Sequence, residues 1–271
     1  MRLQAVRVKG QLKCGDKPAS GVKVKLWDED DGPDPDDVLD EGETDRSGNF
    51  NLEGSTRELT SIDPVLKIYH DCDDGIKPGK RKIKLRIPKQ YISGGSTAKK
   101  AFDVGVLNLE TIFPKEEHFF RMIRQFRIIW MHFWLLFLIL GVVTFSTALR
   151  QQAVAVKGKL LCGNAPARNV RVKLWEEDSG PDPDDLLAQG YTDDQGMFML
   201  KGDTAELTTI DPVFKVYHDC DDNLKLGQRK LKFKIPSSYI SEGKTAKKVF
   251  DIGVLNLETI FPDEEREMIP T

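Results

Sequence analysis

The stretch RKIKLRI at Arg81–Ile87 decides the fold class, because apolar and basic residues alternate along it. Its apolar residues fall on one face and its basic residues on the other: Ile83, Leu85 and Ile87 against Lys82, Lys84 and Arg86. A period of two is the pattern of a β-strand with one buried face and one solvated face. We therefore expect a strand here, with its isoleucines and leucine in a core.

Similar apolar runs recur on both sides of this stretch, at Val6–Cys14, Val22–Leu26, Val65–His70 and Phe102–Leu109. Turn signals separate them, including TDRSGNF at Thr44–Phe50 and an acidic, proline-containing loop at Asp28–Asp37. Only Ser55–Thr60 and Ile92–Ala101 leave room for a helical turn. Short strands divided by turns predict an all-β sandwich.

The whole pattern occurs twice. A shift of 148 positions superimposes Gln4–Glu117 on Gln152–Glu265 without a gap, with roughly two-thirds of the positions identical, far above what shared composition gives. We expect two domains, residues 4–117 (copy one) and residues 151–265 (copy two), each large enough for its own core.

Between the copies, residues 118–150 carry a hydrophobic run, Ile128–Phe145, with arginines before it and small residues after it. One interpretation is a hydrophobic helix that spans a membrane, which makes the chain a single-pass membrane protein with membrane contact through Ile128 to Phe145. The favoured interpretation is a signal peptide with a cleavage site after Ala148. It would be stranded in mid-chain because two neighbouring genes for secreted single-domain proteins are read as one.

Charge and cysteine content narrow the class of protein. Charged residues make up 31% of the chain and the net charge is −3, so nucleic-acid binding is not favoured. Each copy holds two cysteines far apart in sequence: Cys14 and Cys72, then Cys162 and Cys220. They suggest a disulfide within each copy and an oxidising compartment, the alternative being two buried free thiols per copy.

Several short motifs together resemble the nematode transthyretin-like family of small secreted proteins. They are KGQLKCG at Lys9–Gly15, VKLW at Val24–Trp27, GPDPDD at Gly32–Asp37, TDRSGNF at Thr44–Phe50, YHDCDD at Tyr69–Asp74 and FDVGVLNLE at Phe102–Glu110. The resemblance covers both copies. It implies transthyretin-like (prealbumin-type, immunoglobulin-like) β-sandwiches, a signal peptide, and a disulfide of the Cys14–Cys72 kind in each copy.

Catalysis and metal binding are not expected. The enzymes built on this fold, the hydroxyisourate hydrolases, close with a Tyr-Arg-Gly-Ser tetrapeptide, and this chain closes each copy differently, from Asn108 to Pro114 and from Asn256 to Pro262. Each sandwich contains one histidine, His70 or His218, because His118 lies outside the predicted strands; one histidine without a partner group makes no recognisable acid–base site. We predict no catalytic residue, no cofactor and no metal site.

The basic residues that face outward are the candidate binding surface: Lys82, Lys84, Arg86, Lys230, Lys232 and Lys234. This basic stripe could attract a glycan or a lipid headgroup. The favoured interpretation is an edge strand that its lysines protect from pairing. Trp27 and Trp175 are expected in the core.

The expected function is non-enzymatic: extracellular recognition or signalling by a secreted protein, with an unknown extracellular protein, glycan or lipid headgroup as partner. The alternatives are carriage of a small hydrophobic ligand, which needs a channel between subunits, and a membrane-anchored tandem-domain protein.

Overall fold

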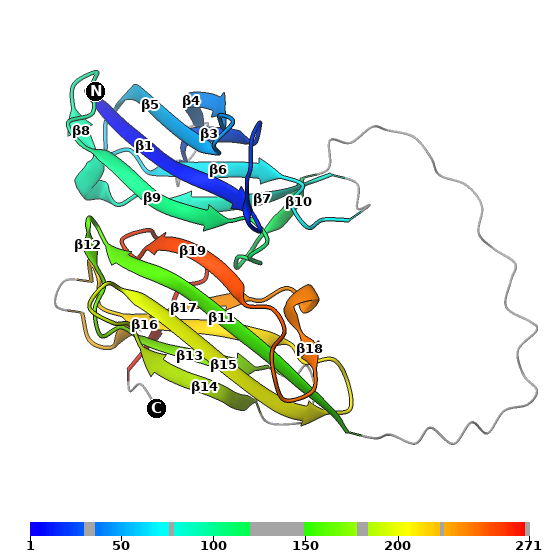
Figure 1. Ribbon diagram of the computed structural model, residues 1–271. Coiled ribbons are helices and arrows are strands. Elements are labelled where there is room, and N and C mark those ends of the chain that lie inside the picture. The colour runs from blue at the N-terminus through cyan, green and yellow to red at the C-terminus, as the bar shows by residue number, and fades with distance from the viewer. Residues whose placement is uncertain (30–35, 76–78, 120–148, 178–183, 223–224, 269–271) are drawn as a thin grey trace, which may run out of the picture.

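The protein is described by a computed structural model over residues 1–29, 36–75, 79–119, 149–177, 184–222 and 225–268. Each copy folds into a β-sandwich (Figure 1), and helix is limited in these ranges to two short 3-10 turns, Lys89–Tyr91 and Ser237–Tyr239. The all-β prediction is confirmed. No helix in the described ranges has the length and hydrophobicity needed to span a bilayer. The hydrophobic helix expected at Ile128–Phe145 lies outside these ranges.

The strands of copy one are, in order, β1 Arg2–Cys14, β2 Lys17–Pro18, β3 Lys23–Asp28, β4 Asp37–Glu43, β5 Asn49–Glu58, β6 Pro64–His70, β7 Lys80–Arg86, β8 Ser93–Gly94, β9 Ala101–Asn108 and β10 Glu117–Phe119. Those of copy two are β11 Arg150–Cys162, β12 Ala165–Pro166, β13 Arg171–Glu176, β14 Asp185–Tyr191, β15 Met197–Glu206, β16 Pro212–His218, β17 Gln228–Lys234, β18 Ser241–Glu242, β19 Phe250–Asn256 and β20 Glu265–Glu267.

Each sandwich has two layers. In copy one, β1 is the central strand of the first layer, antiparallel to β5 and parallel to β9. The second layer is a five-stranded antiparallel sheet in the order β10-β7-β6-β3-β4. Copy two repeats both layers, with β11 between β15 and β19 and a sheet in the order β14-β13-β16-β17-β20.

The core lies between the two layers, and the period of two fills it. In β7, Ile83 and Leu85 point inward and are almost fully buried, while Lys82 and Lys84 point outward. Phe102 of β9, in the first layer, is fully buried in the same core cluster. The expected strand at Arg81–Ile87 is therefore confirmed, with its isoleucines and leucine in the core.

Two disulfides close the sandwiches, Cys14–Cys72 and Cys162–Cys220. Each joins the end of the central first-layer strand to the turn after the middle strand of the second layer. A covalent link across 58 residues stabilises the fold by about 4 kcal/mol in the chain-entropy model.

The structure corrects several expectations. Ser55–Thr60 is not helical, because β5 continues through Glu58, paired with β1. Within Ile92–Ala101 the chain forms the short strand β8, and the 3-10 turn lies before it. Strand β4 was not predicted, since its sequence is acidic and largely exposed. His118 lies in strand β10, where its backbone pairs with Arg81, so the first sandwich extends past residue 117.

The two copies are joined by strand pairing as well as by the chain. Strands β9 and β19 are antiparallel neighbours, so the first layers of both sandwiches merge into one ten-stranded sheet. Figure 1 shows this sheet facing the viewer, with β9 of copy one lying along β19 of copy two.

Candidate functional site

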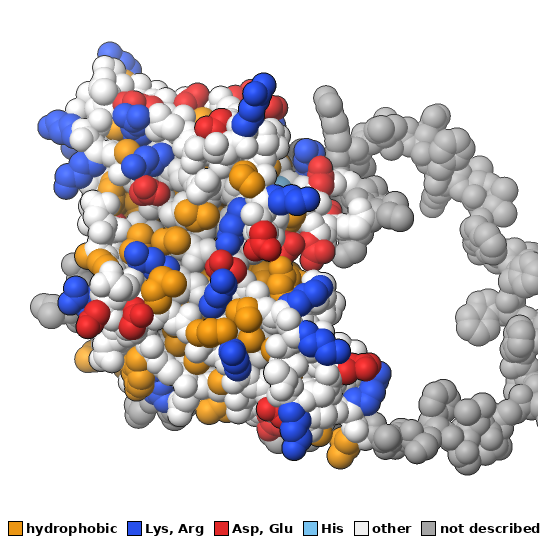
Figure 2. Space-filling view, viewed as in Figure 1, with side chains coloured by type: hydrophobic (Ala, Val, Ile, Leu, Met, Phe, Trp, Pro, Cys, Tyr) orange, Lys and Arg blue, Asp and Glu red, His pale blue; other side chains and the backbone are white. Residues whose placement is uncertain are grey.

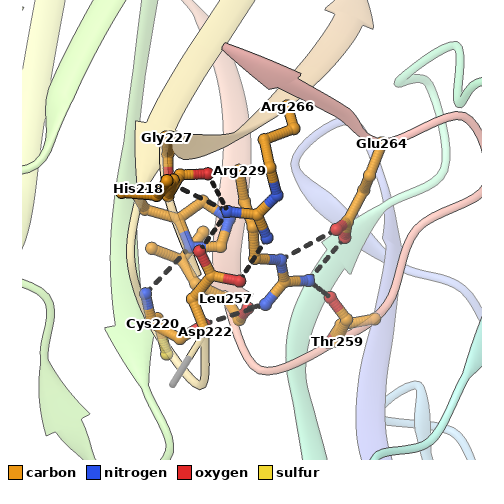
Figure 3. Close-up of polar contacts among 10 residues, drawn as sticks. His218, Cys220, Asp222, Gly227, Arg229, Leu257, Thr259, Glu264 and Arg266 are labelled. Carbon is orange, nitrogen blue, oxygen red and sulfur yellow. Dashed lines mark hydrogen bonds and ion pairs between the residues drawn. The ribbon is translucent and has the colours of Figure 1, made fainter. Parts of the chain in front are cut away.

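A buried arginine lies beside the disulfide at one end of each sandwich. Arg229 is 7% exposed, and its guanidinium donates hydrogen bonds to the carbonyl oxygens of Cys220, Leu257 and Thr259 at 2.9–3.0 Å. It also forms a two-pronged pair with Glu264, Nε–Oε2 2.8 Å and Nη2–Oε1 2.6 Å (Figure 3). This arginine therefore ties the disulfide turn to the end of β19 and to the segment before β20.

Copy one repeats the arrangement. Arg81 bonds to the carbonyl oxygens of Cys72, Leu109 and Thr111, and its Nη2 lies 2.8 Å from Oε2 of Glu116. Burial raises the pKa of Glu116, but hydrogen bonds from His70 and Arg81 outweigh it and hold that pKa below its ordinary value. The sequence reading missed these arginines, although Arg81 stands in the inward phase of β7, two residues before Ile83.

Copy two adds a second arginine at the same end. Arg266 of β20 pairs with both carboxylate oxygens of Asp222, and its Nη1 donates to the carbonyl oxygen of Gly227 at 2.9 Å (Figure 3). The position equivalent to Arg266 in copy one is His118. Arg229 is thus an internal brace whose hydrogen bonds hold backbone segments together, and Arg266 adds an ion pair on the exposed side of the same end.

The two histidines are part of this brace. His218 is 2% exposed; its Nδ1 accepts a hydrogen bond from the backbone N–H of Cys220 at 3.2 Å, so the proton resides on Nε2. Burial, with a smaller effect of Arg229, lowers the pKa of His218 to about 3. Burial likewise lowers the pKa of His70, although a 3.2 Å contact with Glu116 opposes the shift. Neither ring reaches solvent, so neither is placed to meet a substrate.

A group of three potential metal ligands, Cys14, Cys72 and Glu110, comes together near the first disulfide. The two sulfur atoms are bonded to each other and are not thiolates. This group therefore offers a metal one carboxylate, too few ligands for a site.

The basic stripe is not on an edge strand, which corrects the favoured interpretation of its lysines. Strand β7 lies between β6 and β10, and β17 lies between β16 and β20. Acidic side chains from the neighbouring strands and loops pair with four of the six stripe residues: Lys82 with Glu117, Lys84 with Glu29, Lys230 with Glu267, and Lys232 with Glu265. Burial raises the pKa of Glu29, but hydrogen bonds from Lys67 and Lys84 outweigh this effect and hold that pKa below its ordinary value. Much of the stripe's positive charge is balanced.

Trp27 and Trp175 are outside the core, contrary to expectation. Period two places Leu26 inward and Trp27 outward, and Nζ of Lys67 lies 4.0 Å from the centre of the Trp27 ring. Lys215 covers Trp175 in the same way at 4.7 Å. A lysine over an indole face is a cation–π contact, so these tryptophans stabilise the outer surface.

The junction between the copies is built from β9 and β19. Val106 pairs with Val254 at its centre, and Gly105 and Gly253 allow the strands to approach closely. A Cβ atom at Gly105 would lie 2.1 Å from the carbonyl oxygen of Val254, and the φ angle of 89° is one that glycine adopts readily.

Side chains on either side of the paired strands reinforce the junction. The Tyr91 hydroxyl donates to Oε2 of Glu258 at 2.6 Å, and the Tyr239 hydroxyl donates to Oε2 of Glu110 at 2.6 Å. Below the strands, Phe113 stacks on Phe261 with ring centres 6.4 Å apart. Burial and the hydrogen bond from the phenol to Glu258 raise the pKa of Tyr91.

The remaining members of the basic stripe lie at this junction. The backbone of Arg86 exchanges hydrogen bonds with Ile260 at 3.0 and 3.2 Å, and the backbone of Lys234 exchanges them with Ile112 at 3.2 and 3.3 Å. The structure thus divides the six predicted residues between ion pairs on the outer sheets and the contact between copies.

A groove of about 480 Å³ crosses the exposed face of the merged sheet at the junction. The residues that line it include the apolar Val106, Val254 and Leu161 and the charged Lys9 and Asp103. Figure 2 shows hydrophobic side chains across the middle of this face, with basic and acidic side chains among and around them.

The two halves of this face differ. A continuous row of paired residues crosses the six long strands: Asn49, Gln11, Val106, Val254, Lys159 and Met197. Copy one ends the row with Asn49 and copy two ends it with Met197, which is 45% exposed; Met199 nearby is 50% exposed where copy one has Asn51. The apolar area therefore extends into copy two.

The fold and its closing features define a class: a tandem of disulfide-closed, prealbumin-type β-sandwiches. Residues 9–88 and 157–236, together more than half of the chain, match the family model described as Transthyretin-like family. The chain belongs to that family.

Relatives in the nematode Caenorhabditis elegans match one copy's worth of sequence. Transthyretin-like protein 46 is 67% identical over 133 residues, which cover 49% of this chain and 74% of the relative. Transthyretin-like protein 33 is 48% identical over 46% of this chain and 87% of the relative, and transthyretin-like protein 5 is 45% identical over 49% of this chain and 98% of the relative. Protein 5 is thus about half as long as this chain.

Two solved structures of bacterial proteins resemble the chain only weakly. A 9R-lipoxygenase from Cyanothece matches 43% of this chain and 19% of its own, with 24% identity and a TM-score of 0.24. The shaft pilin SpaA from Lactobacillus rhamnosus matches 94% of this chain and 98% of its own, with 10% identity and a TM-score of 0.19. Scores this low support no inference about function.

Proposed function

We propose that the chain is a non-enzymatic extracellular recognition protein and that it binds a protein partner on the exposed face of the merged sheet. The observation that carries this proposal is the groove at the junction, where Val106 and Val254 pair at the centre and both apolar and charged side chains line the walls. An apolar centre within a polar rim is the composition of protein-binding surfaces. The exposed methionines of copy two add flexible apolar area suited to a partner's side chains.

The absence of catalysis is part of the proposal. The titratable cluster that most resembles a site contains His218, Arg229 and Glu264 in copy two. His218 and Arg229 are buried, and backbone carbonyls accept hydrogen bonds from the arginine. A group sealed in this way serves stability rather than turnover.

An extracellular location is supported by the disulfides. Both copies hold one, which suits an oxidising compartment for both; a membrane-spanning segment between them would leave one copy in the reducing cytoplasm. Intact mass and N-terminal sequencing of the native product test this: a species that begins near Leu149 or Arg150 supports cleavage, and a full-length membrane-extracted chain overturns it.

The binding face is tested with a photo-reactive residue placed at Met199 and, as the control, at Tyr191 on the opposite sheet. Both side chains are well exposed. Cross-linked partners from extracellular fluid should appear with the Met199 probe, should be absent with the Tyr191 probe, and should be lost when Met197→Arg is added. Equal cross-linking from both positions, or from neither, contradicts the choice of face; cross-linking at Tyr191 alone favours a partner on the outer sheets, including a glycan or lipid headgroup at the basic stripe.

Carriage of a small hydrophobic ligand is the second candidate, because the groove lies between the copies and has the volume of ligand sites. Titration with an apolar fluorescent dye separates the two. Saturable binding of one dye per chain that Gly105→Ala abolishes favours carriage. If the dye shows no saturable binding, carriage is excluded and recognition of a protein partner is favoured.

A further inference from the structure

The junction between the copies has approximate two-fold symmetry. Several contacts occur twice with the roles exchanged: the Asn108 amide donates to the carbonyl oxygen of Asp251 at 2.8 Å, and the Asn256 amide donates to that of Asp103 at 2.8 Å. The two tyrosine–glutamate bonds and the two backbone bridges described above follow the same rule. A surface that pairs with its own equivalent is self-complementary, as in symmetric dimers.

Positions on the symmetry axis face their own counterparts across the junction. Two of these positions carry the same residue in both copies: Val106 faces Val254, and Phe113 faces Phe261. Such pairs would serve equally well in an association of two identical copies. They provide affinity but no preference between partners.

A third axial position carries opposite charges. Lys115 of copy one forms an ion pair with Asp263 of copy two, and their side chains are 67% and 48% exposed. Two identical copies would bring two lysines or two aspartates together here. Like charges at an interface disfavour the wrong partner.

A second ion pair across the junction is also specific to the mixed pair. Nζ of Lys13 lies 3.2 Å from Oδ2 of Asp251. The residue of copy two equivalent to Lys13 is Leu161. In an association of two copies of the second sandwich, Asp251 would therefore face a leucine and lose this partner.

We propose that the two copies are matched partners: copy two pairs with copy one more tightly than with a second copy of itself, and Lys115–Asp263 and Lys13–Asp251 set the preference. The matching does not depend on covalent connection. Cleavage of the chain between the sandwiches leaves a pair of two different halves.

The test uses the full chain with a protease site inserted between Phe119 and Leu149 and cut after folding. The two halves differ in mass, so native mass spectrometry distinguishes the mixed pair from both self-pairs. After dilution and re-equilibration, random pairing gives a self-pair of copy two at half the abundance of the mixed pair. We expect this self-pair to fall several-fold below that share. A random distribution, an excess of the self-pair, or separation of all halves into monomers overturns the proposal.

Charge variants show whether the assigned residues cause the preference. Lys115→Asp places two aspartates together and should weaken the mixed pair about three- to tenfold, as expected for an exposed charge pair turned from attraction to repulsion. Asp263→Lys in the same chain should restore pairing with the charges exchanged. Lys99→Asp, the same change at an exposed lysine in the loop between β8 and β9, is the control and should leave pairing unchanged.

Salt provides a second readout. The difference between Lys115→Asp and the unaltered chain should shrink at about 1 M salt, where exposed charges are screened within a few ångströms. A difference that persists in salt, or a double variant that stays as weak as the single one, shows that packing rather than charge sets the preference and overturns the assignment of Lys115 and Asp263.

Discussion

At the scale of single residues, the phase of a strand decides the role of a side chain more than its chemical type does. Arg81 and Arg229 stand in the inward phase and become internal braces, whereas Trp27 and Trp175 stand in the outward phase and lie under lysines. An arginine can occupy a buried position because its five N–H donors find carbonyl and carboxylate acceptors.

Removal of one brace should be costly. Arg229→Leu removes the charge partner of Glu264 and the arginine donor of three carbonyl groups, and we expect the free energy of unfolding to fall by about 3–5 kcal/mol. Lys232→Leu, on the outward face of the same strand, is the control and should cost under about 1 kcal/mol. Urea denaturation measures both. Equal losses of unfolding free energy in the two variants would show that Arg229 stabilises the fold no more than an exposed lysine does.

The buried histidines predict a pH dependence of stability. The pKa of His218 is about 3 in the folded protein, and that of an unfolded histidine is about 6.5. Between these values the unfolded chain binds a proton that the folded chain does not, so stability is complete above pH 6.5 and decreases as the pH falls toward 3. The slope attributable to this group is up to about 1.4 kcal/mol per pH unit.

Denaturation of the unaltered chain and His218→Gln between pH 4 and pH 7 tests this expectation, and the variant should show the shallower slope. His70→Gln should change the slope less, because the contact with Glu116 opposes the effect of burial at that ring. Parallel slopes for the unaltered chain and His218→Gln would contradict the prediction.

The residue scale also shows where sequence patterns suffice. The outward phase of Lys82, Lys84 and Arg86 was predictable, because alternation alone assigns a face. Their ion pairs were not, because Glu117 and Glu29 come from segments that only the sheet order brings alongside β7. The brace was missed because the pattern assigns Arg81 to the inward face without showing which acceptors meet it there.

At the scale of elements, the strands with strong alternation were predictable and those defined by pairing were not. The run Arg81–Ile87 falls on β7 almost residue for residue. Strand β4 carries acidic residues and a glycine, and it is a strand because β3 supplies its hydrogen-bonding partner. Whether a strand such as β9 or β19 lies at the edge of a sheet depends on the order of the strands, and the local sequence pattern does not predict that order.

The junction strands should be sensitive to any side chain at Gly105. Gly105→Ala places a Cβ against the carbonyl of Val254 in a backbone conformation that costs alanine about 1–2 kcal/mol, so β9 and β19 should part locally. Hydrogen exchange at the β19 amides should become faster. Gly94→Ala is the control, since a Cβ there has no atom within 4 Å. Unchanged exchange in Gly105→Ala would mean that the strands accommodate the methyl group.

At the scale of the whole molecule, the repeat itself was evident from the sequence, and the merging of the two sandwiches was not. Two copies predict two cores, but whether they touch depends on which edges are left unpaired. Here β9 and β19 offer their free edges to each other. The pairing removes two exposed strand edges that would otherwise invite association with foreign strands.

Coupling between the copies follows from this merged sheet. Leu12→Ala, a fully buried position in copy one, should destabilise that sandwich by about 2–5 kcal/mol. If the junction couples the copies, calorimetry should show the melting of both shifted to lower temperature. In a chain that also carries Gly105→Ala, only copy one should shift. Independent melting in both backgrounds would show that the junction transmits no stability.

The covalent continuity of the two paired copies has a consequence for how the protein behaves when it is scarce. A pair assembled from separate chains falls apart as the solution is diluted below its dissociation constant. Two sandwiches on one chain meet at an effective concentration on the order of millimolar, whatever the amount of protein present. While the chain is whole, the groove that both copies build therefore persists even when the protein is very dilute.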